Sequence, residues 1–202
     1  MIALITSGGV LMIPLALCAL AATFIIFERL FYFISVRRRD AELSLALNQL
    51  LPKLDYNAAI RACSAADTPL SLVTRKALEC RRLCESEIED IAASEAGVLM
   101  PRYEHLLTAL GTIANVSTML GLLGTVTGTI QAFGVFSRGG ALGDPAQLSS
   151  AVAQALVTTA AGLMIAIPSV IFHNYFVSET NKAAARIEAA VTQLIYNLKK
   201  GV

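Results

Sequence analysis

The chain has 202 residues, of which 16 are basic and 15 acidic, so its formal net charge is only +1. Charged residues make up 15% of the sequence, whereas about 25% is usual in soluble domains. A near-neutral charge gives no sign of a nucleic-acid-binding surface. The composition therefore argues against a soluble or nucleic-acid-binding protein and favours a membrane protein.

Three blocks of the sequence contain no Asp, Glu, Lys or Arg: residues 1–27, 105–137 and 145–178. A helix of about 20 apolar residues crosses a bilayer core of ~30 Å, so each block is long enough to span it. The first block is expected to be a retained span rather than a cleaved leader, because no basic residue precedes its apolar run. We predict an all-α integral membrane protein with three transmembrane helices.

The basic residues around these blocks predict the topology, since Lys and Arg near the ends of spans stay in the cytoplasm. Arg37, Arg38 and Arg39 follow the first span directly, and the loop after the second span holds only Arg138. We therefore expect the N-terminus outside and the C-terminus inside. The predicted segments are transmembrane helix 1 (1–36), a cytoplasmic helical domain (37–104), transmembrane helix 2 (105–137), a periplasmic loop (138–144), transmembrane helix 3 (145–178) and a cytoplasmic tail (179–202).

The second and third blocks are longer than a bilayer requires, because a 33-residue helix is about 50 Å long. Both helices are expected to extend into the cytoplasmic helical domain. Inside that domain, Thr68 before Pro69 predicts the start of a helix. The run from Leu70 to Glu104 reads as helical, and Cys80 and Cys84 would share one face of that helix. Asp144 before Pro145 similarly predicts the start of the third span.

Spans two and three are rich in hydroxyl, amide and glycine residues. Small residues let membrane helices approach closely, and hydroxyl groups can then bond across the contact. Ala155, Thr159, Gly162 and Ala166 form one such stripe, by their spacing. Each threonine could instead bond to a carbonyl of its own helix and merely pack. The clustering of these groups on span two favours the other reading, in which several line a wet passage.

Titratable groups are absent from the middle of spans two and three, although an intramembrane proton relay usually needs Asp, Glu or His. His173 lies near the inner end of span three, where an interfacial role is the better interpretation. A partner would therefore have to supply the titrating carboxylate. The cysteines and histidines show no zinc-binding spacing, and we find no nucleophile–base pair or phosphate loop. We expect no enzyme activity, no metal and no cofactor.

Two motifs resemble a known family. The first is Gly121-Leu-Leu-Gly-Thr-Val-Thr-Gly128, followed by Ala132-Phe133. The second is Ala155-Leu-Val-Thr-Thr-Ala-Ala-Gly-Leu163, followed by Ala166-Ile-Pro-Ser169 and Asn174. Together they resemble the MotA/TolQ/ExbB proton-channel family, most closely its ExbB and TolQ branches.

The resemblance implies an all-helical subunit of the bacterial inner membrane that forms a homopentamer. It also implies two copies of a single-span ExbD/TolR-type partner, which brings an Asp into the pore, and a TonB- or TolA-like periplasmic-spanning protein. Thr125 and Thr159 match the family's pore-facing threonines. The full predicted pore lining is Thr125, Thr159, Gln154, Thr158, Thr129 and Thr118, and the predicted helix-packing residues are Gly121, Gly124, Gly128, Gly162 and Pro168.

This sequence departs from the family pattern at two positions. Gln154 stands where the family often has Glu, so this position can form hydrogen bonds but cannot titrate. Thr118 stands where a proline is common, which predicts a straighter second span.

The resulting hypothesis is a channel-forming subunit of an ExbB-ExbD-type motor that uses the proton motive force for TonB-dependent transport across the outer membrane. A TolQ-type subunit of the Tol-Pal system is the alternative within the family. A non-conducting membrane scaffold is the alternative from another class. The residues leave open the choice between H⁺ and Na⁺, and the transported cargo.

Overall fold

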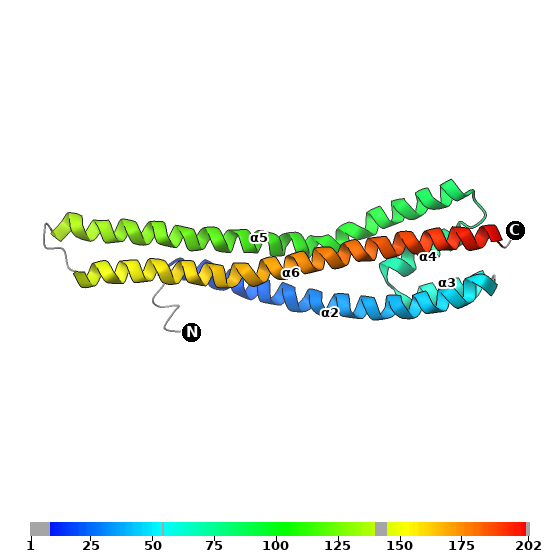
Figure 1. The fold of residues 1–202 in the computed structure, drawn as a ribbon, viewed down its shortest axis with the longest axis horizontal. Helices are drawn as coiled ribbons and strands as arrows, with labels where there is room; N and C mark the ends of the chain where they lie inside the picture. Colours follow the sequence, from blue (N-terminus) through cyan, green and yellow to red (C-terminus); the bar gives the residue numbers. More distant parts are fainter. Residues whose placement is uncertain (1–8, 54, 140–144, 201–202) are drawn as a thin grey trace. The chain divides into compact units, whose positions relative to one another are not determined.

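A computed structural model describes residues 9–53, 55–139 and 145–200, and the described residues contain helices and no strand. In chain order the elements are α2 (Met12–Leu50), the short 3-10 helix η1 (Leu51–Lys53), α3 (Tyr56–Ala66), α4 (Pro69–Glu79), α5 (Glu85–Gly139) and α6 (Pro145–Lys200) (Figure 1). Three of these helices, α2, α5 and α6, are long and apolar enough to cross a membrane. The predicted all-α fold with three spans is thereby confirmed.

The chain divides into two compact units, and each of the three long helices contributes to both. The first, here called the apolar unit, comprises Met1–Phe27 and Thr108–Asn174. The second, here called the charged unit, comprises Glu28–Leu107 and Tyr175–Val202. α5 and α6 extend far beyond the uncharged blocks, as expected. α2 is extended as well, since it continues without a break past Arg37–Arg39 to Leu50.

The apolar unit is built from parts of α2, α5 and α6 and exposes large apolar side chains. Leu20, Phe24, Met119 and Met164 are each about two-thirds exposed or more. Exposed apolar side chains in such number are typical of helices that contact a membrane or other proteins. The unit's buried contacts are made instead by small residues such as Ala114, Ala155 and Ala166 and by several glycines.

The charged unit packs around a core of branched apolar side chains. These come from α2, η1, α3, α4, α5 and α6, and they include Leu43, Leu51, Leu70, Val73, Leu78, Ile88, Val191 and Leu194. The helices α3 and α4 are joined through Asp67, which adopts a left-handed backbone conformation with φ of 45°. The unit therefore resembles a soluble helical domain in the composition of its core.

The predicted start of a helix at Thr68 and Pro69 is confirmed. The Thr68 hydroxyl accepts a hydrogen bond from the Ser71 N–H at 3.2 Å, and the Ser71 hydroxyl accepts one from the Thr68 N–H at 2.9 Å. This reciprocal pair is a capping box, with Pro69 at the first helical position. α6 also begins at the predicted Pro145. Of the predicted 138–144 loop, residues 138 and 139 belong to α5, and residues 140–144, with the proposed cap Asp144, lie outside the described residues.

The expectation that Cys80 and Cys84 lie on one helix is wrong. α4 ends at Glu79, a turn follows, and α5 begins at Glu85. The Cys84 N–H donates to the Glu87 carboxylate at 3.1 Å, as an N-terminal residue of a helix commonly does to a Glu three positions on. Because Cys80 and Cys84 flank this turn, they do not share a helix face. All four cysteines are free thiols.

Candidate functional site: a glycine and threonine crossing of two membrane helices

Three glycines of α5 lie against α6 in the apolar unit. A Cβ atom added at Gly124 would lie 2.6 Å from the Thr158 Cβ, and one added at Gly128 would lie 2.4 Å from the Ala155 Cβ. A Cβ at Gly121 would lie 3.3 Å from the Thr159 backbone. Real Cβ atoms do not approach other atoms to 2.4–2.6 Å, so the two helices pack at a separation that only glycine permits.

Gly162 makes the corresponding approach from α6. A Cβ at this position would lie 2.6 Å from the Ser117 carbonyl oxygen and 3.0 Å from the Gly121 Cα, both of them backbone atoms of α5. Ser117 itself is completely buried. Sequence reasoning did not identify Ser117 as a contact for Gly162. We call the contact of Gly121, Gly124, Gly128 and Gly162 with the facing helix the α5–α6 crossing.

Thr159 joins the two helices at this crossing. Its hydroxyl lies 2.8 Å from the Gly121 carbonyl oxygen of α5 and 3.2 Å from the Ala155 carbonyl oxygen of its own helix, and it donates to these acceptors. Because a hydroxyl has one hydrogen, the shorter bond to Gly121 is the principal one. Thr159 is half-buried, so part of its surface remains accessible in the single chain.

Thr158, the next residue along the chain, has different surroundings. Its side chain is 1% exposed, and its hydroxyl donates to the Gln154 carbonyl oxygen at 2.9 Å. Its methyl group faces Gly124. The structure therefore places Thr158 inside the contact between α5 and α6.

The other predicted pore threonines lie on α5 and bond to their own helix. The hydroxyls of Thr118, Thr125 and Thr129 donate to carbonyl oxygens three or four residues earlier, at 3.1, 2.7 and 2.8 Å respectively. Thr129 is exposed, whereas Thr118 and Thr125 are half-buried. Thr125 stands four residues after Gly121, about 6 Å along the helix, so it lies one turn from the carbonyl that Thr159 binds.

Gln154 and Pro168 lie on α6 outside the α5–α6 crossing. Gln154 is half-buried, and a Cβ at Gly9 would lie 2.3 Å from its amide nitrogen, so residue 9 packs closely against it. Gly9 has a positive φ of 71°, which glycine tolerates best. Pro168 is exposed, whereas Ala166 and Ser169 beside it are buried. The neighbours of Pro168, rather than the proline itself, therefore occupy the buried face of α6.

The charged unit contains a buried polar cluster that the sequence analysis did not identify. Asp40 is only 4% exposed, and its Oδ1 atom has no hydrogen-bond partner in the structure. Burial raises the pKa of the Asp40 carboxyl, while the nearby Thr68 hydroxyl and the Arg186 and Arg39 guanidinium groups oppose that rise. No sequence signal pointed to it, because an aspartate directly after three arginines reads as a solvated residue.

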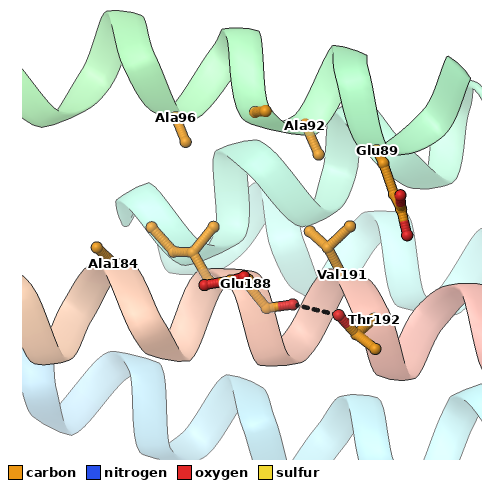
Figure 2. A pocket seen from close by; sticks show the side chains of 9 residues that line it. Glu89, Ala92, Ala96, Ala184, Glu188, Val191 and Thr192 are labelled. Carbon is orange, nitrogen blue, oxygen red and sulfur yellow. Dashed lines mark hydrogen bonds between the residues drawn. The ribbon is translucent and has the colours of Figure 1, made fainter. Parts of the chain in front are cut away.

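The charged unit also has a groove between α5 and α6, shown in Figure 2, with a volume of about 420 Å³. Alanine side chains such as Ala92, Ala96 and Ala184 line it, with carboxylates of Glu89 and Glu188 among them. The Thr192 hydroxyl in this groove donates to the Glu188 backbone carbonyl oxygen at 3.0 Å. The described residues also contain no cluster of His, Cys, Asp and Glu that could hold a metal ion.

The apolar unit thus combines parts of three apolar helices with a close crossing and hydroxyl groups, which indicates a multi-pass membrane protein. The model of the MotA/TolQ/ExbB proton channel family matches residues 65–189, which include the crossing. The chain belongs to this family. The family is one of proton channels and not of enzymes.

Three similar proteins support the assignment. The ExbB-like 3 biopolymer transport protein of Synechocystis is 28% identical over 189 residues, which are 93% of this chain and 90% of that protein. The biopolymer transport protein ExbB of Neisseria gonorrhoeae is 30% identical over 136 residues, 60% of this chain and 61% of that protein. The Tol-Pal system protein TolQ of Haemophilus influenzae is 39% identical over 71 residues, 35% of this chain and 31% of that protein.

Proposed function

We propose that this chain is the channel-forming subunit of an inner-membrane motor of the ExbB-ExbD type, which uses the proton motive force to drive TonB-dependent transport across the outer membrane. The observation that supports this most is the α5–α6 crossing, which is hydroxyl-bearing and free of charge. Residues 106–137 and 145–172 contain no Asp, Glu, Lys, Arg or His. A wall of this kind suits an acidic group that another chain brings into the membrane.

The proposed assembly is a ring of five copies around two single-span partner helices of the ExbD/TolR type, each carrying an intramembrane Asp. α5 and α6 would line the ring. Thr125 and Thr159, separated by about one helical turn, would meet the partner's carboxyl. Pore-lining roles for Gln154, Thr158, Thr118 and Thr129 are part of the same proposal, with Thr158 also packed against α5 within a single chain.

The driving force would come from ions that bind the partner's Asp on one side and leave it on the other. One elementary charge crossing 100 mV releases about 2.3 kcal/mol. Five equivalent wall sites cannot all be occupied at once by two partner helices. Relative rotation of ring and partner is therefore the natural output, and a TonB-like protein that spans the periplasm would receive it.

The proposed orientation follows from the basic residues that flank the spans. Arg37–Arg39 and the basic tail would lie in the cytoplasm, with the N-terminus and the 138–144 loop in the periplasm. A membrane-impermeant thiol reagent on intact cells tests this orientation. We expect no labelling of the exposed Cys84 in intact cells and full labelling after permeabilisation.

Proton flux in liposomes tests the channel assignment. The chain would be reconstituted with and without its ExbD-type partner, and acidification of the lumen followed under an applied potential. We expect flux only with the partner, and its loss in Thr159→Val and Thr125→Val while the complex still copurifies. Thr23→Val is the matched control, because Thr23 is a hydroxyl of α2 that bonds to its own helix at Ala19. Normal flux in both pore variants would contradict the pore assignment.

Two alternatives make different predictions. A TolQ-type subunit of the Tol-Pal system would copurify with a TolA-like rather than a TonB-like protein, and the similarity to the Haemophilus TolQ favours this within the family. ExbB names among the other relatives favour the TonB-linked branch. A non-conducting scaffold would show no flux with any partner, and it would tolerate valine at both threonine positions.

A further inference from the structure

The hydrogen of the Thr159 hydroxyl already forms a hydrogen bond within the chain. It points at the Gly121 carbonyl oxygen of the facing helix at 2.8 Å, with Ala155 as a second acceptor. A hydroxyl has one hydrogen and two lone pairs, so what remains for an incoming group is acceptor capacity. Thr125 is in the same state, since its hydroxyl donates to the Leu122 carbonyl oxygen at 2.7 Å. The crossing therefore presents hydrogen-bond acceptors.

We propose that Thr159 is a positioning residue that converts the charge state of a carboxyl group in the ring into a change in the α5–α6 crossing. This rests on the proposed function, which brings the carboxyl group of the partner beside Thr159. A protonated carboxyl donates its own hydrogen to the Thr159 oxygen, and the bond from Thr159 to Gly121 stays. An ionised carboxylate has no hydrogen to give, so it binds only if the Thr159 hydroxyl turns away from Gly121 and donates to it.

The competition for this hydrogen favours the carboxylate. Hydrogen bonds to an ionised acceptor are roughly twice as strong as those between neutral groups, so the carboxylate displaces the Gly121 carbonyl. No covalent bond changes in the exchange. The hydroxyl keeps its proton, its O–H turns about the Cβ–Oγ1 bond, and the Gly121 carbonyl loses its bond from α6.

The crossing is placed to respond to that loss. The atoms of α6 nearest to Gly121 are backbone atoms of Thr159 and Gly162, so no side chain separates the two helices at Gly121. Membrane helices gain little from apolar contact with each other, because lipid offers the same contact. A cross-helix hydrogen bond at the closest approach therefore makes an important contribution to holding the pair. Ionisation of the partner would loosen the crossing, and protonation would restore it.

Few groups in this chain could cause a pH response at the crossing by themselves. The parts of α5 and α6 that pack there, residues 106–137 and 145–172, contain no titratable side chain. The part of α2 in the apolar unit, Met12–Phe27, contributes only Cys18. His173 of α6 also lies in the apolar unit, where a Cβ at Gly111 of α5 would lie 3.1 Å from its ring. A pH-dependent change at the crossing is therefore assigned to the incoming carboxyl only when the Asn partner abolishes it.

Distance measurements between α5 and α6 test the proposal. Spin labels would be placed on Met119→Cys and Met164→Cys, two exposed positions flanking the crossing, with the four native cysteines replaced by Ser. Double electron–electron resonance would be recorded from pH 4 to pH 9 on the complex with its ExbD-type partner. The comparison complex would carry that partner with its intramembrane Asp changed to Asn.

We expect the distance distribution to shift with pH in the complex, and to be independent of pH with the Asn partner. Thr159→Ala should abolish the shift, Thr159→Ser should retain it, and the control Thr23→Val should leave it unchanged. Copurification with the partner checks assembly, and Thr159→Val replaces Thr159→Ala if the latter does not assemble.

A shift of the same size in Thr159→Ala, or one that persists with the Asn partner, would overturn the proposal. An unchanging distance in a complex that conducts protons would also overturn it, and would leave the channel function standing. Absence of proton flux in the unmodified complex would refute the proposed function, and this inference would fall with it.

Discussion

The close backbone approach at Gly162 gives a quantitative prediction for Gly162→Ala. The added Cβ would lie 2.6 Å from the Ser117 carbonyl oxygen, and no flexible side chain can move aside to relieve the clash, since the nearest atoms all belong to the α5 backbone. Overpacking of a close contact costs about 1–3 kcal/mol. Replacing glycine by alanine inside a helix returns up to about 1 kcal/mol. We expect a net loss of roughly 1–2 kcal/mol, or about five- to thirtyfold in the ratio of folded to unfolded protein.

The same helices provide the matched control. A Cβ at Gly134 of α5 would meet nothing within 4 Å, so Gly134→Ala should be neutral or stabilising by up to about 1 kcal/mol. The chain contains no Trp, so separation of α5 from α6 would be followed by energy transfer between dyes on the two helices during titration with SDS. If Gly162→Ala proved as stable as Gly134→Ala, the described crossing would be incorrect.

Three further predictions concern the charged unit. Thr68→Ala removes the cap of α4 and should lower the free energy of unfolding by about 0.5–2 kcal/mol in a thermal melt, whereas Ser64→Ala on an exposed face should not. Burial raises the pKa of the Cys63 thiol to about 11, so iodoacetamide at pH 8 should modify exposed Cys84 much faster than Cys63, as measured by mass spectrometry. Burial also raises the pKa of the Asp40 carboxyl, so the folded state binds that proton more tightly than the unfolded state and loses stability as pH rises through the raised value. Asp40→Asn should therefore be more stable than the native protein at pH 7.5, with the difference disappearing at acidic pH; equal denaturation midpoints at both pH values would contradict this.

The three long helices could be predicted because lipid imposes a requirement that is visible along a single chain. A span needs about 20 residues without charge, and each uncharged block met that condition. The cap at Thr68 was predictable for a similar reason, since the hydroxyl and the proline that start α4 are adjacent in sequence. Both signals are local, so they need no knowledge of what packs against them.

The end of α4 and the start of α5 were not predictable from the same kind of signal. Cys84 is not a residue type that favours the start of a helix, and the Glu87 side chain that accepts its N–H looked like one of several solvated acids. The different surroundings of Thr158 and Thr159 were also hidden. The two residues are adjacent in the sequence, and their roles depend on which glycine of α5 each one faces.

α5 and α6 pack in one way in the apolar unit and in another way in the charged unit. The difference follows from the surrounding solvent, which we expect to be lipid for the first unit and water for the second. In the apolar unit, lipid competes with every apolar contact, so the helices associate through glycine-permitted backbone contact and the hydroxyl of Thr159. In the charged unit, water drives burial, so Ile88, Leu99 and Leu194 pack into a branched apolar core. A hydroxyl adds little to the stability of such an apolar core, whereas at the crossing the Thr159 hydroxyl forms a hydrogen bond between the two helices. Any group that competes for the hydrogen of Thr159 thus acts at the point where the α5 and α6 backbones lie in direct contact.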